Sequence, residues 1–283
     1  MSENAGEMVN GAAEREGAGA GAMELKAVGV VHTEAKERRD VVCGGSTAVV
    51  EVFEPFWPAL DQIEHNSHIV LFGWFHRSDR SVLKTRPRKV APFAFERGVF
   101  ASRSPDRPNP VAMTIVPLLE KRGHELIVRD LDFIDGTPLI DIKPYCPGWD
   151  SVFSAVHRRR ANPALQTDAI LREFYRRDLI NHVGREAALS PTGELAVEAC
   201  LLATRHLECD PRDADLCLVL HGIHPLMDGL MAITGASLTN GRLTLIVPAQ
   251  NQESGLPLRA DLMRGGKVLR LESPDGREPW KVL

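Results

Sequence analysis

Apolar residues follow different patterns in the two halves of the chain. The first half has short apolar runs between polar loops, which predicts strands at 24–32 and 48–53. The run HIVLFGWFH, residues 68–76, is continuously apolar and is typical of a strand buried on both faces. A short helix is predicted at 56–63, with Pro58 near its start. This half therefore reads as a small β domain.

Two further apolar runs, IVPLLE and LIVRDLDF, are separated by the polar turn 121–124. Such a pair is typical of a hairpin. A hairpin brings the segments on its two sides, Arg97–Val116 and Asp130–Tyr145, to the same end of a sheet. We expect any site in this half to be built from these two segments.

From about Pro163 the pattern changes. Helices are predicted at 165–183 and 193–207, where apolar residues recur with helical period. LCLVLHGIHPL predicts a strand that enters a loop, and the stretch 227–249 predicts a helix, a turn at Asn240–Gly241 and a strand. The chain ends in short strands with turns at 265–266 and 275–276. The fold class is therefore α+β, with a second domain that buries its own core.

Composition adds few constraints. A length of 283 residues favours two domains, and 43% hydrophobic with 25% charged residues is ordinary globular material. A net charge of -4 gives no general attraction to nucleic acid or to anionic membrane, so contact with RNA requires a local basic patch. The five cysteines show no metal-ligand spacing, which favours a reduced, cytoplasmic protein without a disulfide framework.

The segment 1–22 is rich in Gly, Ala and Glu and has almost no large apolar residue. We expect it to be a disordered tail, because it cannot bury enough surface to offset its chain entropy. It does not read as a secretory signal, and no apolar run in the chain is long enough to span a bilayer, so no membrane partner is expected. Met23 is the expected functional start.

Two polar loops carry candidate chemistry of opposite sign. Arg103 and Arg107 precede Pro108-Asn109-Pro110, whose prolines hold the loop in a set geometry. Asp132, Asp135 and Asp141 surround the turn Gly136-Thr137-Pro138. Arginine suits a carboxylate or a phosphate and a carboxylate suits a cation, so a ligand such as S-adenosylmethionine would fit both. The alternative is a pair of ordinary surface turns joined by Arg–Asp ion pairs.

The segments FASRSPDRPNPVAM and DFIDGTPLIDIKPY resemble the two signature segments of the TsaA-like (TrmO) family. The resemblance extends from about residue 25 to 150 and includes VGVVHTEAKE and IEHNSHIVLFGWFHR. It implies a mixed β-barrel over 23–155 that binds S-adenosylmethionine without a Rossmann fold, usually as a homodimer. It also implies methyl transfer to threonylcarbamoyladenosine of tRNA. The second α+β domain then occupies 163–283.

The resemblance also implies which residues hold the cofactor. These are Arg103, Ile115, the pair His76 and Arg77, and the segment formed by Asp132, Phe133, Ile134 and Asp135. The reaction needs no metal, and His76 or Asp135 is a candidate to take the proton of the acceptor amine. His32 is interpreted as structural. Substitution of either Arg103 or Asp135 by alanine is predicted to weaken cofactor binding.

The chain departs from the family pattern at two single positions and in one run of four residues. Arg77 replaces a Gln, Ala112 replaces a Gly, and the run Val42-Cys43-Gly44-Gly45 stands where a Pro-Arg-Gln element contacts the cofactor. The changed loop leaves a small-molecule methyltransferase of the same fold as an alternative. A non-catalytic S-adenosylmethionine-binding or sensing protein is a second alternative, although both signature segments are retained.

A basic patch between Arg77 and Arg107 is the candidate RNA surface. Its cations outnumber its acids, and Phe93 and Phe95 are available to stack on a base. Arg158, Arg159 and Arg160 extend it. A solvated loop that aids solubility is the alternative.

The stretch 227–246 resembles, more weakly, a segment of the FmdE family, but Ala236 stands where that family has a cysteine. Metal binding is therefore not expected there. The spacing of His221, His224 and Asp228 would allow a metal site, but a loop of hydrogen-bonded polar groups is the favoured interpretation. A dimerisation or substrate-selecting module is the alternative for this domain.

Overall fold

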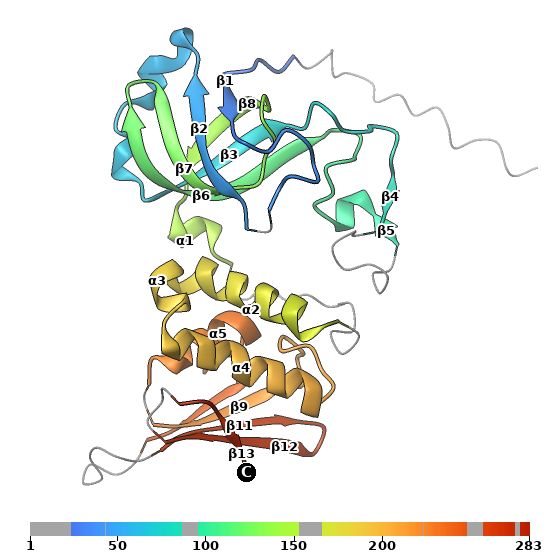
Figure 1. Cartoon of the computed structure of the whole chain (residues 1–283), viewed down its shortest axis with the longest axis vertical. Coiled ribbons are helices and arrows are strands. Elements are labelled where there is room, and N and C mark those ends of the chain that lie inside the picture. The colour runs from blue at the N-terminus through green and yellow to red at the C-terminus, as the bar shows by residue number, and fades with distance from the viewer. Residues whose placement is uncertain are drawn as a thin grey trace, which may run out of the picture. The chain divides into compact units, whose positions relative to one another are not determined.

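The computed structural model describes residues 24–42, 44–86, 96–152, 166–222, 224–247, 257–274 and 278–283 (Figure 1). The chain divides into two compact units. The first comprises the described residues up to Ser78 together with Asn109–Tyr145, and the second comprises Asp79–Pro108 together with Cys146–Leu283. Each unit is described by itself.

The first unit is a closed six-stranded barrel. Its strands pair in the order β1-β2-β7-β6-β3-β8, and all six pairings are antiparallel. The barrel expected from the sequence is thereby confirmed, with antiparallel pairing throughout in place of the mixed pairing that the resemblance implied. The strands are β1 (Gly29–His32), β2 (Ser46–Val52), β3 (His68–Trp74), β6 (Val111–Arg122), β7 (Glu125–Leu131) and β8 (Pro138–Pro144).

Alternation of side chains along the strands fills the barrel interior. In β3, Ile69 and Leu71 are buried in the barrel core, whereas the side chain of Phe72 is on the other face, where Lys143 lies over its ring. Gly73 also lies on the inner side, because a Cβ there would be 2.8 Å from Cε2 of Phe133. The absence of a side chain at Gly73 therefore makes room for Phe133 in the core.

The predicted hairpin is present as β6 and β7. Arg122 pairs with Glu125 across a two-residue turn, and Gly123 has a φ of 62°, which a residue without Cβ adopts at little cost. The helix expected at 56–63 is instead a 3-10 helix, η1 (Glu54–Leu60), followed by η2 (Ile63–His65). Pro58 lies inside η1 and has no N–H to donate, which disfavours an α-helix there.

The segment Asp79–Pro108 leaves the barrel after β3 and returns to it before β6; we call it the excursion. Next to the two ends of the excursion, the N–H of Phe75 donates to the carbonyl of Pro110 at 2.9 Å. The excursion contains β4 (Lys84–Thr85), which pairs with β5 (Arg97–Gly98), and the 3-10 turn η4 (Val99–Ala101). The two barrel strands on either side of it, β3 and β6, pair with each other along their length.

The rest of the second unit has a five-stranded sheet of order β10-β9-β11-β12-β13, in which only β9 and β10 are parallel. Figure 1 shows α2, α4 and α5 together on one face of this sheet. The elements are α1 (Pro147–Asp150), α2 (Asp168–Val183), α3 (Arg185–Ala188), α4 (Pro191–His206), β9 (Cys217–His221), α5 (Leu226–Thr234), β10 (Leu243–Ile246), β11 (Leu258–Arg264), β12 (Lys267–Ser273) and β13 (Lys281–Val282).

The two long helices begin at capping residues rather than at the first apolar residue. The hydroxyl of Thr167 accepts the N–H of Ile170, and that of Ser190 accepts the N–H of Gly193. In α5, Gly229 packs against α4, since a Cβ there would be 2.7 Å from Cβ of Ala196. The helices, strands and Gly265–Gly266 turn of this unit confirm the α+β prediction.

Several sequence-based predictions fall outside the described residues. They concern the tail 1–22, Cys43, Phe93, Phe95, the turn 275–276 and the arginines at 158–160.

Among the described residues no helix is long and apolar enough to cross a membrane. The four cysteines of the described ranges are free thiols. Burial raises the pKa of Cys200 and Cys209, so both are poor nucleophiles.

Candidate functional site

The loop that follows β1 packs against the acidic segment between β7 and β8. The N–H of Asp135 donates to the carbonyl of Ala35 at 2.8 Å, and the N–H of Gly136 donates to the carbonyl of Val31 at 2.8 Å. In return, the N–H of Thr33 donates to Oδ1 of Asp135 at 3.0 Å. These bonds fix the position of the Asp135 carboxylate.

Asp135 also forms an ion pair with Lys36, whose Nζ lies 2.8 Å from Oδ2. The hydrogen bond from Lys36, followed by the one from the Thr33 N–H, lowers the pKa of Asp135. The carboxyl group is therefore ionised over the neutral pH range. It is also only half-buried, so a ligand can reach it.

Arg77 binds the same loop from the other side. Its Nη1 donates to the carbonyl of Lys36 at 2.9 Å and lies 3.5 Å from Oε1 of Glu37. Arg38 in turn donates to the carbonyl of Arg77 at 2.6 Å. We call these contacts between Arg77 and residues 36–38 the clamp. Lys36 is thus the common neighbour of Arg77 and Asp135, two of the residues named from the sequence.

His76 precedes Arg77 in a turn after β3 and is exposed. Partial desolvation, followed by the neighbouring charge of Arg77, lowers the pKa of His76. The imidazole is therefore neutral near pH 7. A neutral imidazole with an accessible nitrogen can accept a proton.

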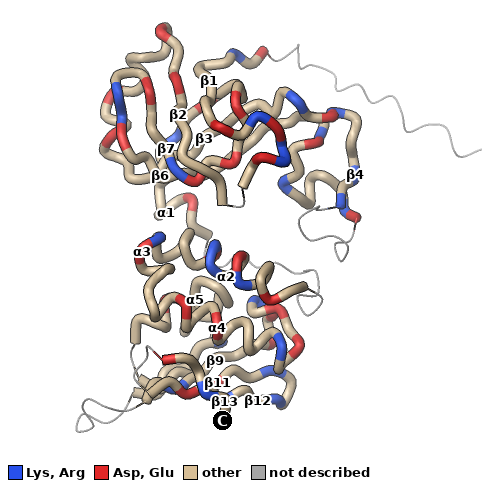
Figure 2. The backbone as a smooth tube through the Cα atoms, in the orientation of Figure 1, with Lys and Arg blue, Asp and Glu red and all other residues tan. Residues whose placement is uncertain are grey.

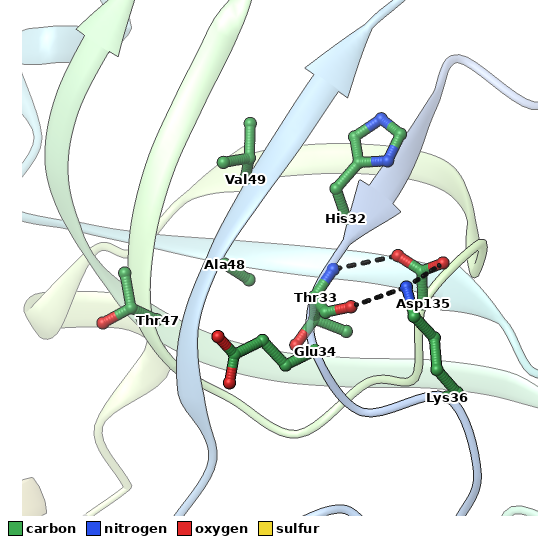
Figure 3. A pocket seen from close by; sticks show the side chains of 8 residues that line it. All are labelled: His32, Thr33, Glu34, Lys36, Thr47, Ala48, Val49 and Asp135. Atoms are coloured by element: carbon green, nitrogen blue, oxygen red, sulfur yellow. Dashed lines mark hydrogen bonds and ion pairs between the residues drawn. The ribbon is translucent and has the colours of Figure 1, made fainter.

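An open pocket lies beside the Asp135–Lys36 ion pair (Figure 3). It is lined by His32, Thr33, Glu34, Lys36, Thr47, Ala48, Val49 and Asp135. His32 belongs to this pocket, and its Nε2 lies 2.8 Å from Oε2 of Glu51. The sequence favours a structural role for His32 and does not single out Thr33, Lys36 or Thr47. The available signal was the stretch VGVVHTEAKE, which contains three of these four residues.

The residues before Asp135 serve the core. Phe133 and Ile134 are buried, and the ring of Phe133 packs edge-on against Phe75 with 5.5 Å between centroids. The carbonyl of Ile134 accepts the hydroxyl of Thr137 at 2.7 Å. Asp132 is exposed. Any contact of Phe133 or Ile134 with a ligand would therefore come from backbone atoms.

Ile115 is not among the pocket residues. It lies on the outer face of β6, 43% exposed, opposite Val70 of β3. Val111 and Met113 are exposed on the same strand. These side chains form an apolar row on the barrel surface, and the contact of Ile115 with a cofactor stays a prediction.

The two signature arginines differ in their surroundings. Arg107 donates to the carbonyls of Ser104 at 2.8 Å and Val99 at 2.7 Å, and also to that of Ser102. Arg103 is exposed and makes no ion pair within the described ranges. Both belong to the second compact unit, so the assignment of Arg103 to the cofactor stays a prediction.

The acidic loop does not show the alternative arrangement of Arg–Asp pairs at Asp135 and Asp141. Asp135 pairs with Lys36, and Asp141 pairs with Lys143 at 2.6 Å. These two carboxylates therefore differ: one faces the pocket, and the other lies on β8 away from it.

In the second unit, the polar residues named for metal-like spacing have separate partners. Nδ1 of His224 accepts the N–H of Leu226 at 3.1 Å, and His221 lies 4.0 Å from Asp261. Among the described residues there is no group of three or more His, Cys, Asp or Glu side chains that could hold a metal. The FmdE-like resemblance of this region stays a prediction.

Substitution of Asp135 by alanine is expected to lower the affinity for S-adenosylmethionine about tenfold or more, the effect of losing one charge-assisted hydrogen bond. The change leaves the Thr33 N–H and the Lys36 ammonium without their partner. Isothermal titration would measure the affinity. Asp141→Ala is the matched control, because it removes a lysine-paired carboxylate outside the pocket. Equal affinities of the two variants would contradict the assignment.

Comparison with known proteins shows which family the first half of the chain resembles. Residues 31–151 match the family model of the tRNA-methyltransferase O N-terminal domain. A probable S-adenosyl-L-methionine-binding protein of Pyrococcus abyssi is 44% identical over 130 residues, which is 44% of this chain and 68% of that protein. A protein of the same description from Archaeoglobus fulgidus is 32% identical over 244 residues, 81% of this chain and 63% of that protein.

A tRNA (adenine(37)-N6)-methyltransferase of Mus musculus is 30% identical over 118 residues, 40% of this chain and 27% of that protein. The region that matches the family model, 31–151, contains the end of β1, the other five barrel strands, the loop at 33–40 and Asp135. The resemblance found in the two signature segments is thereby confirmed. The chain belongs to the family defined by the tRNA-methyltransferase O N-terminal domain.

Proposed function

We propose that the protein is an S-adenosylmethionine-dependent methyltransferase that methylates N6 of threonylcarbamoyladenosine in tRNA. The observation that carries the proposal is the Asp135–Lys36 ion pair at an open pocket, held by Thr33 on one side and Arg77 on the other. This pocket lies within the region that matches the family model. The relatives' names support the cofactor and the reaction type.

The residues of the pocket suit the cofactor. S-adenosylmethionine carries a carboxylate, an ammonium and a sulfonium, and Lys36 and Asp135 supply one charge of each sign. Lys36 would hold the carboxylate, and Asp135 would hold a cationic group or a ribose hydroxyl. When bound, the cofactor supplies an electrophilic methyl group, so the protein's task is to position the acceptor and exclude water.

Of the two candidate bases, His76 is favoured. The pKa of Asp135 is lowered by its two hydrogen-bond donors, so this carboxylate is a weak base that already has partners. The pKa of His76 is also lowered, but for an imidazole this leaves the neutral, proton-accepting form at pH 7. His76 would take the proton that the acceptor nitrogen loses as its bond to the methyl carbon forms.

The choice of acceptor rests on the relative from Mus musculus, which is named as a tRNA methyltransferase acting on N6 of adenine 37. The altered run Val42–Gly45 favours a second candidate, a small-molecule acceptor, because it replaces an element that contacts the cofactor in the family. A homodimer follows from the family resemblance and a cytoplasmic location from the cysteine pattern, and both stay predictions.

Methyl transfer from labelled S-adenosylmethionine tests the proposal. The acceptors are bulk tRNA that carries threonylcarbamoyladenosine, tRNA that lacks it, and a small-molecule extract. We expect label only in the modified tRNA. Label in the extract alone would identify a small-molecule methyltransferase, and cofactor binding without any transfer would identify a sensing protein.

A further inference from the structure

The excursion presents an aromatic side chain to solvent. Phe100 is 85% exposed and lies in η4, between buried Val99 and exposed Ala101. Leu83, whose carbonyl accepts the N–H of Val99 at 3.0 Å, is exposed as well. Burial of Val99 anchors the turn, so Phe100 is held on the outer side.

The turn that carries Phe100 is rigidly braced. The carbonyl of Val99 accepts bonds from the N–H and the hydroxyl of Ser102, both at 3.2 Å. It also accepts a hydrogen bond from Nη2 of Arg107. The guanidinium of Arg107 donates to two further carbonyls of the same loop, those of Ser102 and Ser104. An exposed ring on a braced turn loses little conformational freedom when it binds a flat partner.

Two exposed cations lie in the strand pair beside this turn. Lys84 and Arg97 lie in the two strands that lead into the turn, are exposed, and make no ion pair within the described part of the chain. Of the acids in the described part of the excursion, Asp79 accepts the hydroxyl of Ser81 and Asp106 accepts the N–H of Asp79 at 2.9 Å. Glu96, next to Arg97, is exposed, so cations outnumber acids here without being alone. Figure 2 shows basic and acidic positions side by side on the tube near β4.

From this arrangement we infer that Phe100 stacks on an unpaired nucleobase of the RNA acceptor, while Lys84 and Arg97 contact its phosphates. The inference rests on the proposed function and names the residues that bind the acceptor RNA. A phenyl ring has no hydrogen-bonding group, so the stack holds any base and positions the strand without reading its sequence. The aromatic residues first considered for this role, Phe93 and Phe95, lie outside the described residues.

Binding of a fluorescein-labelled anticodon stem–loop tests the inference. Phe100→Ala and Phe100→Leu are expected to weaken RNA binding about tenfold, while Phe100→Trp keeps it, because stacking needs an aromatic ring. Trp149→Ala is the matched control, since Trp149 is an equally exposed aromatic outside the excursion. Full affinity of Phe100→Ala, or of Phe100→Leu, would overturn the stacking role.

Salt dependence separates the two kinds of contact. Arg97→Gln is expected to reduce the slope of log affinity against log salt by about one, since one phosphate contact is lost. Phe100→Ala is expected to lower the affinity at every salt concentration without changing that slope. Phe100-dependent binding to anionic lipid vesicles in place of RNA would also overturn the inference.

The failure of the inference and that of the proposed function are distinguishable. If the wild type methylates modified tRNA and Phe100→Ala does so with an unchanged KM, only the stacking role fails. If the wild type methylates no tRNA but binds the stem–loop through Phe100, only the proposed acceptor fails. Titration of S-adenosylmethionine into each variant should give the wild-type affinity.

Discussion

Replacement of His76 by alanine is expected to slow methyl transfer about a hundredfold, the lower end of what a general base contributes. Cofactor affinity should change far less, because the neighbouring clamp of Arg77 on Lys36 is untouched. Single-turnover transfer to modified tRNA, with saturating cofactor, measures the chemical step. His65→Ala, at an exposed histidine in η2, is the matched control.

The pH dependence gives a second readout for His76. Its pKa is lowered, so the imidazole should stay neutral down to a pH below the ordinary histidine value near 6.5. The wild-type rate should therefore be flat around pH 7 and fall only as the pH drops through that lowered pKa. The His76→Ala variant should lack this acidic limb. A variant that keeps both the rate and the limb would show that another group accepts the proton.

Substitution of Gly45 by alanine is expected to destabilise the barrel by about 3 kcal/mol or more, through added strain and overpacking. Gly45 has a φ of 75°, and a Cβ there would lie 2.3 Å from the carbonyl carbon of Asp130 and 2.7 Å from that of Leu131. Neither neighbour is a flexible side chain that can move aside. The backbone at the start of β2 or at the end of β7 must shift.

Gly44 supplies a matched control one residue away. Its φ is 87°, but nothing lies within 4 Å of a Cβ at this position. Gly44→Ala should therefore cost only the conformational strain, about 1 kcal/mol. Urea unfolding of both variants gives the difference, and hydrogen exchange in β2 and β7 locates it. Equal unfolding free energies would mean that the predicted clash is relieved by a small movement.

Local patterns were sufficient for most of the elements. The apolar run of β3 and the polar turn between β6 and β7 carry their own signals. The cap at Thr167 explains why α2 begins three residues after its predicted start, and the cap at Ser190 explains why α4 begins two residues before its predicted start. The strand expected at 24–32 is shorter, β1 at Gly29–His32, and pairs with both β2 and β8. Strand ends are set by such pairing, which a single sequence does not contain.

Only part of the site could be predicted from the sequence, because the residues that form it are far apart in the chain. Asp135 was named from a signature segment and Arg77 from the resemblance of IEHNSHIVLFGWFHR, but the bond from Thr33 to Asp135 spans 102 positions. No periodicity links residues at that distance. Lys36 was therefore missed, although it contacts both. Phe133 and Ile134 lie in the same motif, but their side chains are buried, so their predicted contact with the cofactor would involve backbone atoms and stays a prediction.

The brace around Val99 changes how a mutational scan of the signature segment should be read. The guanidinium of Arg107 donates hydrogen bonds to three backbone carbonyls of its own loop. Substitution of Arg107 would therefore loosen a turn rather than remove a ligand contact. A lysine there has one nitrogen and cannot reproduce the planar fork. Intolerance at Arg107 would thus report on the shape of the loop, whereas intolerance at the exposed Arg103, four residues away, would support its predicted contact with the cofactor.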